Sequence, residues 1–131
     1  MKMSYTAIAT LLAWACVLQT MAADGAPSLP PPSSKKNVAF TQDILPIFQK
    51  SCVGCHGPEK AKGKIRLDSL ESVIKGGEHG KIIQAGNSAR SKLVLAVAGE
   101  TDEPMPPKGK GDPLTPEQIG LIRAWIDQGA K

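Results

Sequence analysis

The stretch that decides the fold is Cys52-Val53-Gly54-Cys55-His56. Two cysteines three residues apart lie on the same side of a helical turn, so both thiols can reach one bound group. His56 follows directly and places an imidazole at the same position. The motif therefore predicts one group held by two sulfur atoms, with a ring nitrogen beside it.

Cys-x-x-Cys-His is the sequence mark of covalent c-type haem attachment. In this interpretation Cys52 and Cys55 form the two thioethers of one haem c, and His56 is the proximal ligand of the iron. The chain has three cysteines, and the third, Cys16, lies in the N-terminal segment described below. The sequence thus predicts a single covalent haem.

The motif allows three other interpretations. A disulfide between Cys52 and Cys55 would close a small, strained loop. A thioredoxin-like redox pair needs a βαβ setting, which the sequence lacks. A zinc site of Cys52, Cys55, His56 and His79 would crowd three ligands into five residues. Haem attachment is favoured over all three.

Length and composition bound the function. The 131 residues permit one small domain, and three cysteines are too few for a disulfide scaffold. A net charge of +4, with the basic residues scattered, does not indicate nucleic-acid binding. Aromatic residues make up only 4% of the chain, which leaves little bulk for a core. A haem would supply that bulk, so we expect the haem-free chain to be largely unfolded.

The first 23 residues have the pattern of a secretory signal peptide. Lys2 precedes an uncharged, mostly apolar run over residues 7–18, and small residues then lead to Asp24. We expect cleavage near residue 23 and a periplasmic or otherwise exported protein. An alternative is a membrane anchor over residues 7–23, although a span needs about 20 apolar residues. Lipidation at Cys16 is disfavoured by the bulky Trp14 before it.

The remainder divides into a linker and one domain. Residues 24–37 are rich in Pro and Ser, which favours an extended, solvated spacer. Residues 38–131 carry the helical patterns and form the predicted cytochrome c domain.

The pattern of apolar residues predicts an all-α domain. Phe40, Ile44, Ile47 and Phe48 recur at helical spacing, so they predict a first helix. Thr41 is its expected cap, and the helix should run into Cys52. Asp68 and Glu71 indicate a capped helical turn over 69–75, and residues 88–97 read as a helix that buries Leu93, Val94 and Val97. Thr115, Pro116 and Gln118 form the start of the clearest helix. Its buried stripe is Ile119, Ile122, Trp125 and Ile126, and Gly129 ends it.

Met105 is favoured as the second axial ligand of the iron. It lies far in sequence from His56, in Glu103-Pro104-Met105-Pro106-Pro107, where prolines stiffen the backbone. His79, in a Gly-rich loop, and an open or water-bound iron are the alternatives. Because Met/His ligation raises the reduction potential, it predicts an electron carrier toward the oxidising end of a respiratory chain.

The residues together resemble the Planctomycete-type cytochrome c domain, a class I cytochrome c. The resemblance runs from Phe40 through Cys52-x-x-Cys55-His56-Gly57, Lys62–Asp68, Gly76-Gly77-x-x-Gly80, Gly86, Ser91-Lys92-Leu93, Met105-Pro106-Pro107 and Leu114 to Trp125-Ile126-x-x-Gly129-Ala130. It implies His56 and Met105 as axial ligands, and N- and C-terminal helices packed together. Lys81 and Ala85 depart from prolines common in the family.

The predicted function is electron transfer through Fe(III)/Fe(II) cycling, without a substrate and without a catalytic constellation. A basic rim of Lys50, Lys60, Lys62, Lys64 and Arg66 would dock an acidic redox partner, unless it is an ordinary solvated surface. Two alternatives remain open. One is a haem sensor or peroxidase-like protein with a labile methionine ligand, and the other is a tethered redox subunit of a larger dehydrogenase.

Overall fold

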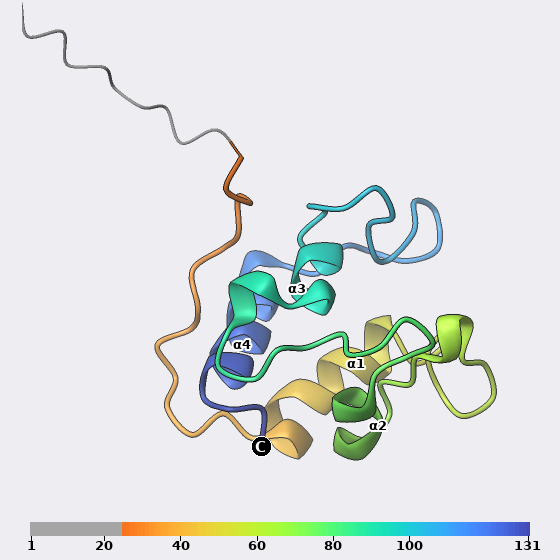
Figure 1. The fold of residues 1–131 in the computed structure, drawn as a ribbon, viewed down its shortest axis with the longest axis horizontal. Coiled ribbons are helices and arrows are strands. Elements are labelled where there is room, and N and C mark those ends of the chain that lie inside the picture. Colours follow the sequence, from red (N-terminus) through yellow and green to blue (C-terminus); the bar gives the residue numbers. More distant parts are fainter. Residues whose placement is uncertain (1–24) are drawn as a thin grey trace, which may run out of the picture.

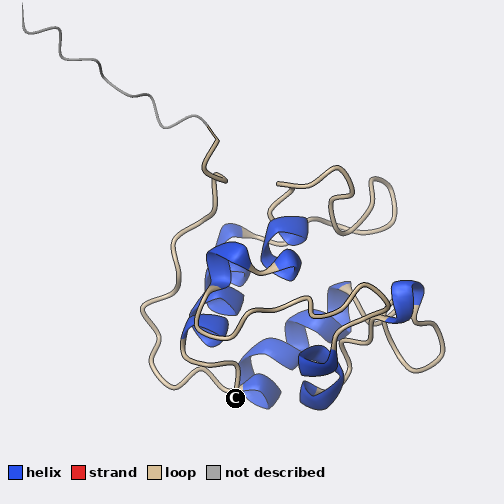
Figure 2. Cartoon of the chain, viewed as in Figure 1, coloured by secondary structure: helices blue, strands red, loops and turns tan. Residues whose placement is uncertain are grey.

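A computed structural model describes residues 25–131, which form short helices joined by long loops (Figures 1 and 2). The α-helices are α1 (Leu45–Ser51), α2 (Leu70–Lys75), α3 (Lys92–Val97) and α4 (Pro116–Asp127). A π-helical turn, η1 (Phe40–Ile44), precedes α1, and the 3-10 turns are η2 (Lys62–Lys64) and η3 (Ser88–Arg90).

Residues 25–131 contain no β-strand, only isolated bridges, so the predicted all-α class is confirmed. Within the same residues, none of the helices is both long and apolar enough to cross a membrane. The predicted signal peptide over residues 1–23, with its anchor alternative, lies outside the described residues.

Helix α4 begins as the sequence predicts. The Thr115 hydroxyl accepts from the Gln118 N–H at 3.2 Å, and the Gln118 amide oxygen accepts from the Thr115 N–H at 2.9 Å. This reciprocal capping satisfies donors that a helix start otherwise leaves unpaired. The predicted apolar stripe is buried, with Ile122, Trp125 and Ile126 at 0% exposure.

The first helix forms where it was expected, but its cap was predicted wrongly. Ala39, not Thr41, is the N-cap residue of η1, and its side chain makes no capping bond. Instead the Asp43 carboxylate accepts from the Ala39 N–H at 2.9 Å, reaching back from the first turn. The π-helical turn then passes into α1, with Pro46 in its first turn where a missing N–H costs nothing.

The N- and C-terminal helices pack through aromatic rings. The Phe40 ring lies 6.2 Å from the Phe48 ring and 5.5 Å from the Trp125 ring, between ring centroids. Aromatic pairs at these separations add about 0.5–1.5 kcal/mol beyond the area they bury. The packing of these helices agrees with the predicted class I cytochrome c architecture.

The helix predicted over 88–97 is interrupted at Ser91. The Ser91 hydroxyl donates to the Asn87 carbonyl oxygen and accepts from the Gln84 N–H, each at 2.9 Å. These bonds hold Ser91 in an extended conformation between η3 and α3. The face of α3 with Leu93, Val94 and Val97 is buried as predicted.

Helix α2 spans the predicted turn with a different cap. Ser69 is the N-cap residue, and its hydroxyl accepts from the Ser72 N–H at 3.2 Å. Asp68 instead receives two bonds from the Arg66 guanidinium, at 3.0 and 2.6 Å. The side chain that was expected to cap α2 therefore forms a surface ion pair.

The segment predicted as a solvated spacer lies against α4 over much of its length (Figure 1). We call residues 29–38 the strap. The Ser33 N–H donates to the Gly120 carbonyl oxygen at 2.8 Å, and the Arg123 guanidinium donates to the Pro30 carbonyl oxygen. Leu29 packs against the core. The prolines keep the strap extended, and α4 pairs with two of its backbone groups, the Pro30 carbonyl oxygen and the Ser33 N–H.

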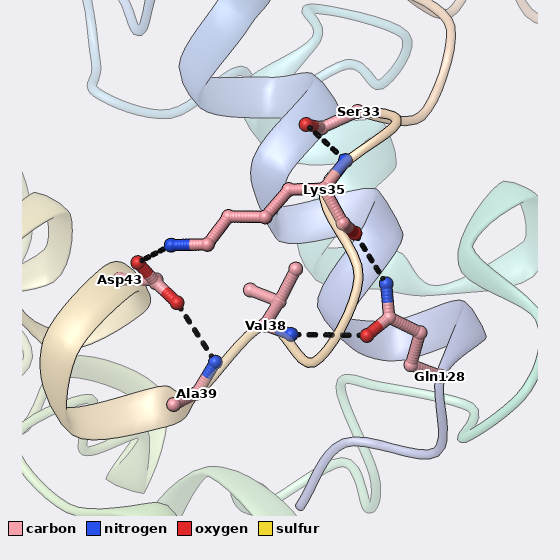
Figure 3. Close-up of polar contacts among 6 residues, drawn as sticks. All are labelled: Ser33, Lys35, Val38, Ala39, Asp43 and Gln128. Atoms are coloured by element: carbon pink, nitrogen blue, oxygen red, sulfur yellow. Dashed lines mark hydrogen bonds and ion pairs between the residues drawn. The ribbon is translucent and has the colours of Figure 1, made fainter.

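Gln128 fastens the C-terminal end of the strap with both atoms of its amide (Figure 3). Its oxygen accepts from the Val38 N–H at 3.0 Å, and its nitrogen donates to the Lys35 carbonyl oxygen at 2.8 Å. The Lys35 ammonium also pairs with the Asp43 carboxylate. The pKa of Asp43 is lowered chiefly by the hydrogen bond from Lys35 and next by the hydrogen bond from the Ala39 N–H.

Candidate functional site

The cysteine motif continues the last turn of α1. Helix α1 ends at Ser51, and the Cys52 N–H still donates to the Phe48 carbonyl oxygen at 2.8 Å. The Cys52 carbonyl oxygen then accepts from the N–H groups of Cys55, at 3.1 Å, and His56, at 2.9 Å. Cys52, Cys55 and His56 therefore follow a helix-like turn, as their spacing predicts.

The following loop holds the motif from its other side. The His56 carbonyl oxygen accepts from the Leu67 N–H at 2.8 Å, and the Cys55 carbonyl oxygen accepts from the Lys62 N–H at 3.1 Å. Gly57 is needed at the turn, since a Cβ there would lie 2.5 Å from the Val53 carbonyl oxygen. The backbone around the motif is thereby fixed without use of the cysteine or histidine side chains.

Cys52, Cys55, His56 and Met105 all line one cavity of about 750 Å³. This volume falls in the range of about 300–1,000 Å³ that is usual for cofactor sites. The apolar part of its wall comes from several elements: Ile65, Leu67, Ile82, Leu93, Ala96, Val97 and Leu114. The four predicted site residues, which span more than 50 positions of sequence, thus meet around a space large enough for a cofactor and lined mainly by apolar side chains.

Met105 reaches the cavity from the long loop after α3. Its N–H donates to the Ala96 carbonyl oxygen at 2.9 Å, which ties the loop to α3. The side chain is half-buried and packs against the core, and Pro106 and Pro107 line the cavity beside it. The stiffened loop that the sequence predicts therefore presents a thioether at the cavity.

His79 lines the same cavity but lies at its edge. Its side chain is 89% exposed, and its Nε2 lies 3.7 Å from a Glu78 carboxylate oxygen. The two candidates for the second axial position therefore differ in solvent exposure: Met105 is half-buried, whereas the His79 imidazole is exposed to water.

The side chains of the motif have the chemistry that covalent haem requires. Cys52 and Cys55 are free thiols, and burial raises the pKa of Cys52 to about 11. His56 Nδ1 is buried without a hydrogen-bond partner, which leaves Nε2 as the nitrogen available to an iron in the cavity.

A zinc site receives no support. Within residues 25–131, no three His, Cys, Asp or Glu side chains are grouped so that they could hold a metal ion. The arrangement of Cys52, Cys55, His56 and His79 considered above is therefore not formed in this part of the chain. The donors present fit an iron whose other ligands come from a porphyrin.

The five residues of the predicted basic rim are all exposed. Lys50 also lines the cavity, and Lys60, Lys62 and Lys64 lie on the loop beyond the motif. Arg66 is engaged with Asp68, as described above, so its charge is offset locally.

Sequence reasoning missed some of the wall. Ile82 is only 7% exposed and Leu114 only 6%, and both lie in segments without helical periodicity. The adjacent pair Ile82-Ile83, apolar within a Gly-rich loop, was the available signal.

The fold is that of a small all-α domain, and one of its cavities brings together the residues of the Cys-x-x-Cys-His motif and Met105. The family model Planctomycete cytochrome C matches residues 52–109, which begin at the first motif cysteine and include Met105. The predicted resemblance is therefore confirmed over this part of the chain, and the family indicates haem-based electron transfer.

One solved structure, Kuenenia stuttgartiensis hydrazine synthase, has a similar fold. The match has a TM-score of 0.51 and 20% sequence identity, and it covers 74% of this chain. It covers only 16% of the chain of that protein, so the likeness is to a part of a much longer polypeptide. No curated protein matches this sequence significantly.

Proposed function

We propose that the chain is an exported, monohaem c-type cytochrome that carries electrons between partner proteins. The observation that supports this most strongly is the meeting of Cys52, Cys55, His56 and Met105 at one cavity of about 750 Å³. In bacteria covalent haem attachment takes place after export, which agrees with the predicted signal peptide over residues 1–23.

Each site residue has its own role in this proposal. The Cys52 and Cys55 sulfur atoms would hold the haem through thioethers, and His56 would bind its iron through Nε2. Bound haem supplies a one-electron Fe(III)/Fe(II) couple. The apolar wall around it, including Leu67 and Val97, keeps water from the iron, which favours the less charged ferrous state.

Met105 is the proposed second ligand rather than His79. A half-buried thioether tied to α3 needs little ordering to stay at the cavity. An imidazole that is 89% exposed would have to give up its hydration and its neighbour Glu78. If His56 and Met105 both bound the iron, they would leave it no open site for a substrate, so this ligand pair favours a carrier over a peroxidase-like protein.

A second candidate is a redox subunit or module of a larger assembly. The observation that favours it is that a similar fold occurs within hydrazine synthase, as 16% of a longer chain. In that case the same haem site would exchange electrons with a fixed partner. Lys60, Lys62 and Lys64 of the predicted basic rim are exposed in the chain by itself. In such an assembly the partner would cover them.

Redox titration of the purified haem protein tests the carrier proposal. We expect one reversible one-electron transition, a lower potential in Met105→Ala, and an unchanged potential in His79→Ala, which serves as the matched control. A potential that moves with His79→Ala but not with Met105→Ala would contradict the assignment. Rapid turnover of peroxide by the wild-type protein would contradict the carrier function.

A further inference from the structure

A second cavity lies beside the haem site and is not used by the proposed electron transfer. Its volume is about 560 Å³. It is lined by the end of α2, the loop that follows residue 80, the start of α3 and residues 129–130 near the C-terminus.

The charged residues around this second cavity are all basic. Lys81, Arg90 and Lys92 line it, and no acidic residue does. All three are exposed, and within residues 25–131 none of their side chains takes part in a salt bridge. The Lys81 ammonium contacts only a neutral acceptor, the Ile74 carbonyl oxygen at 3.5 Å. The site therefore carries uncompensated positive charge, which favours an anionic occupant.

Besides its basic residues and the polar residues Gln84 and Ser91, the second cavity is lined by apolar side chains. Ile82 and Ile83 are buried, and Ile74 is 39% exposed, the one exposed large apolar side chain among residues 25–131. An occupant that fits both features combines acidic groups with at least one apolar side chain.

Two residues belong to both cavities. Lys92 and Ile82 line the second cavity and also the cavity that holds Cys52, Cys55 and His56. An occupant of the second cavity would therefore sit one side chain away from the haem site. A partner docked there would lie next to the cavity proposed to hold the haem.

We propose that the second cavity is a docking site for an acidic segment of the redox partner, with an apolar side chain seated on Ile74. This inference rests on the proposed electron-transfer function and places the partner at Lys81, Arg90 and Lys92. None of these three residues belongs to the predicted basic rim, of which Lys50 lies in α1 and the other four lie on the loop around η2. Three cations that line one cavity suit a single peptide segment better than a flat anionic surface, which would contact dispersed charges.

Calorimetric titration with a short peptide tests the site. The probe is a heptapeptide with acidic residues on both sides of a central leucine, added to the haem-loaded protein at low ionic strength. The test variant carries Lys81→Glu and Arg90→Glu, and the matched control carries Lys60→Glu and Lys62→Glu. Both pairs change the net charge equally, so they separate a local site from the overall charge.

We expect the test pair to weaken peptide binding about tenfold or more and the control pair to weaken it by less than about threefold. Ile74→Asn, which keeps every charge, should also weaken binding severalfold. Equal losses in both pairs, no effect of Ile74→Asn, or no binding by the wild-type protein would overturn the proposal. Anionic lipid vesicles that bind with the same dependence on Lys81 and Arg90, while the peptide does not, would also overturn it.

The redox titration on the same samples keeps the two proposals apart. Peptide binding without a reversible haem couple would refute electron transfer and not the anionic site. A normal couple without peptide binding would refute the docking site alone.

Discussion

Replacing Gly120 with alanine tests whether the strap is part of the folded domain. Gly120 lies inside α4, where glycine is about 1 kcal/mol less favourable than alanine. If the strap were the solvated spacer predicted from composition, Gly120→Ala would therefore stabilise the protein. In the structure, however, a Cβ at this position would lie 2.7 Å from the Pro31 carbonyl oxygen.

The size of the effect follows from the contacts that must give way. Moving Pro31 off α4 loosens the Ser33 N–H bond to the Gly120 carbonyl oxygen and the Arg123 bond to the Pro30 carbonyl oxygen. Each such bond contributes about 1 kcal/mol net. A loss of about 2 kcal/mol against a gain of about 1 kcal/mol leaves Gly120→Ala destabilised by about 1 kcal/mol.

Urea unfolding of the haem-loaded protein, followed by circular dichroism, measures this change. The control is the same substitution in a variant that lacks residues 24–33, where the clash is gone and Gly120→Ala should stabilise by up to about 1 kcal/mol. The two backgrounds should thus differ by about 2 kcal/mol. Equal stabilisation by alanine in both would refute the docked strap.

Two further predictions concern the motif and the strap. Gly57→Ala places a Cβ 2.5 Å from the Val53 carbonyl oxygen, so we expect a loss of about 1–3 kcal/mol in urea unfolding and less haem retained per chain; wild-type stability and haem content would contradict the tight turn. Because Lys35 and the Ala39 N–H lower the pKa of Asp43, their stabilisation is present above pH 3.8 and is lost as the pH falls through the lower, folded pKa. Thermal unfolding at a series of pH values should show an acid-side loss that is smaller in Asp43→Asn, and identical profiles would contradict this linkage.

The site could be predicted largely from local sequence. Cys52, Cys55 and His56 are close in the chain, so helix geometry alone places their side chains together. Met105 could be proposed because few other donors exist and prolines flank it. The cavity wall could not be predicted in the same way, because Ile82 and Leu114 join it through contacts between distant segments.

In the fold, too, features set by neighbouring residues could be predicted, and features set by distant contacts could not. The start of α4 depends on Thr115 and Gln118, three residues apart, and was predicted correctly. The break at Ser91 depends on which of two competing sets of hydrogen bonds its hydroxyl makes, and periodicity does not report this choice. The docking of the strap depends in part on the hydrogen bond between Gln128 and Val38, which are 90 residues apart. Amino-acid composition cannot predict a contact between such distant residues.

The central claim is that one haem is held covalently by Cys52 and Cys55, with iron bound by His56 and Met105. Intact-mass measurement and the absorption spectrum of the purified ferric protein test it together. We predict the mass of one haem on the chain cleaved near residue 23, and the weak long-wavelength band of iron–thioether ligation, which Met105→Ala abolishes and His79→Ala retains. A chain without covalent haem, or a band that survives Met105→Ala, would contradict it.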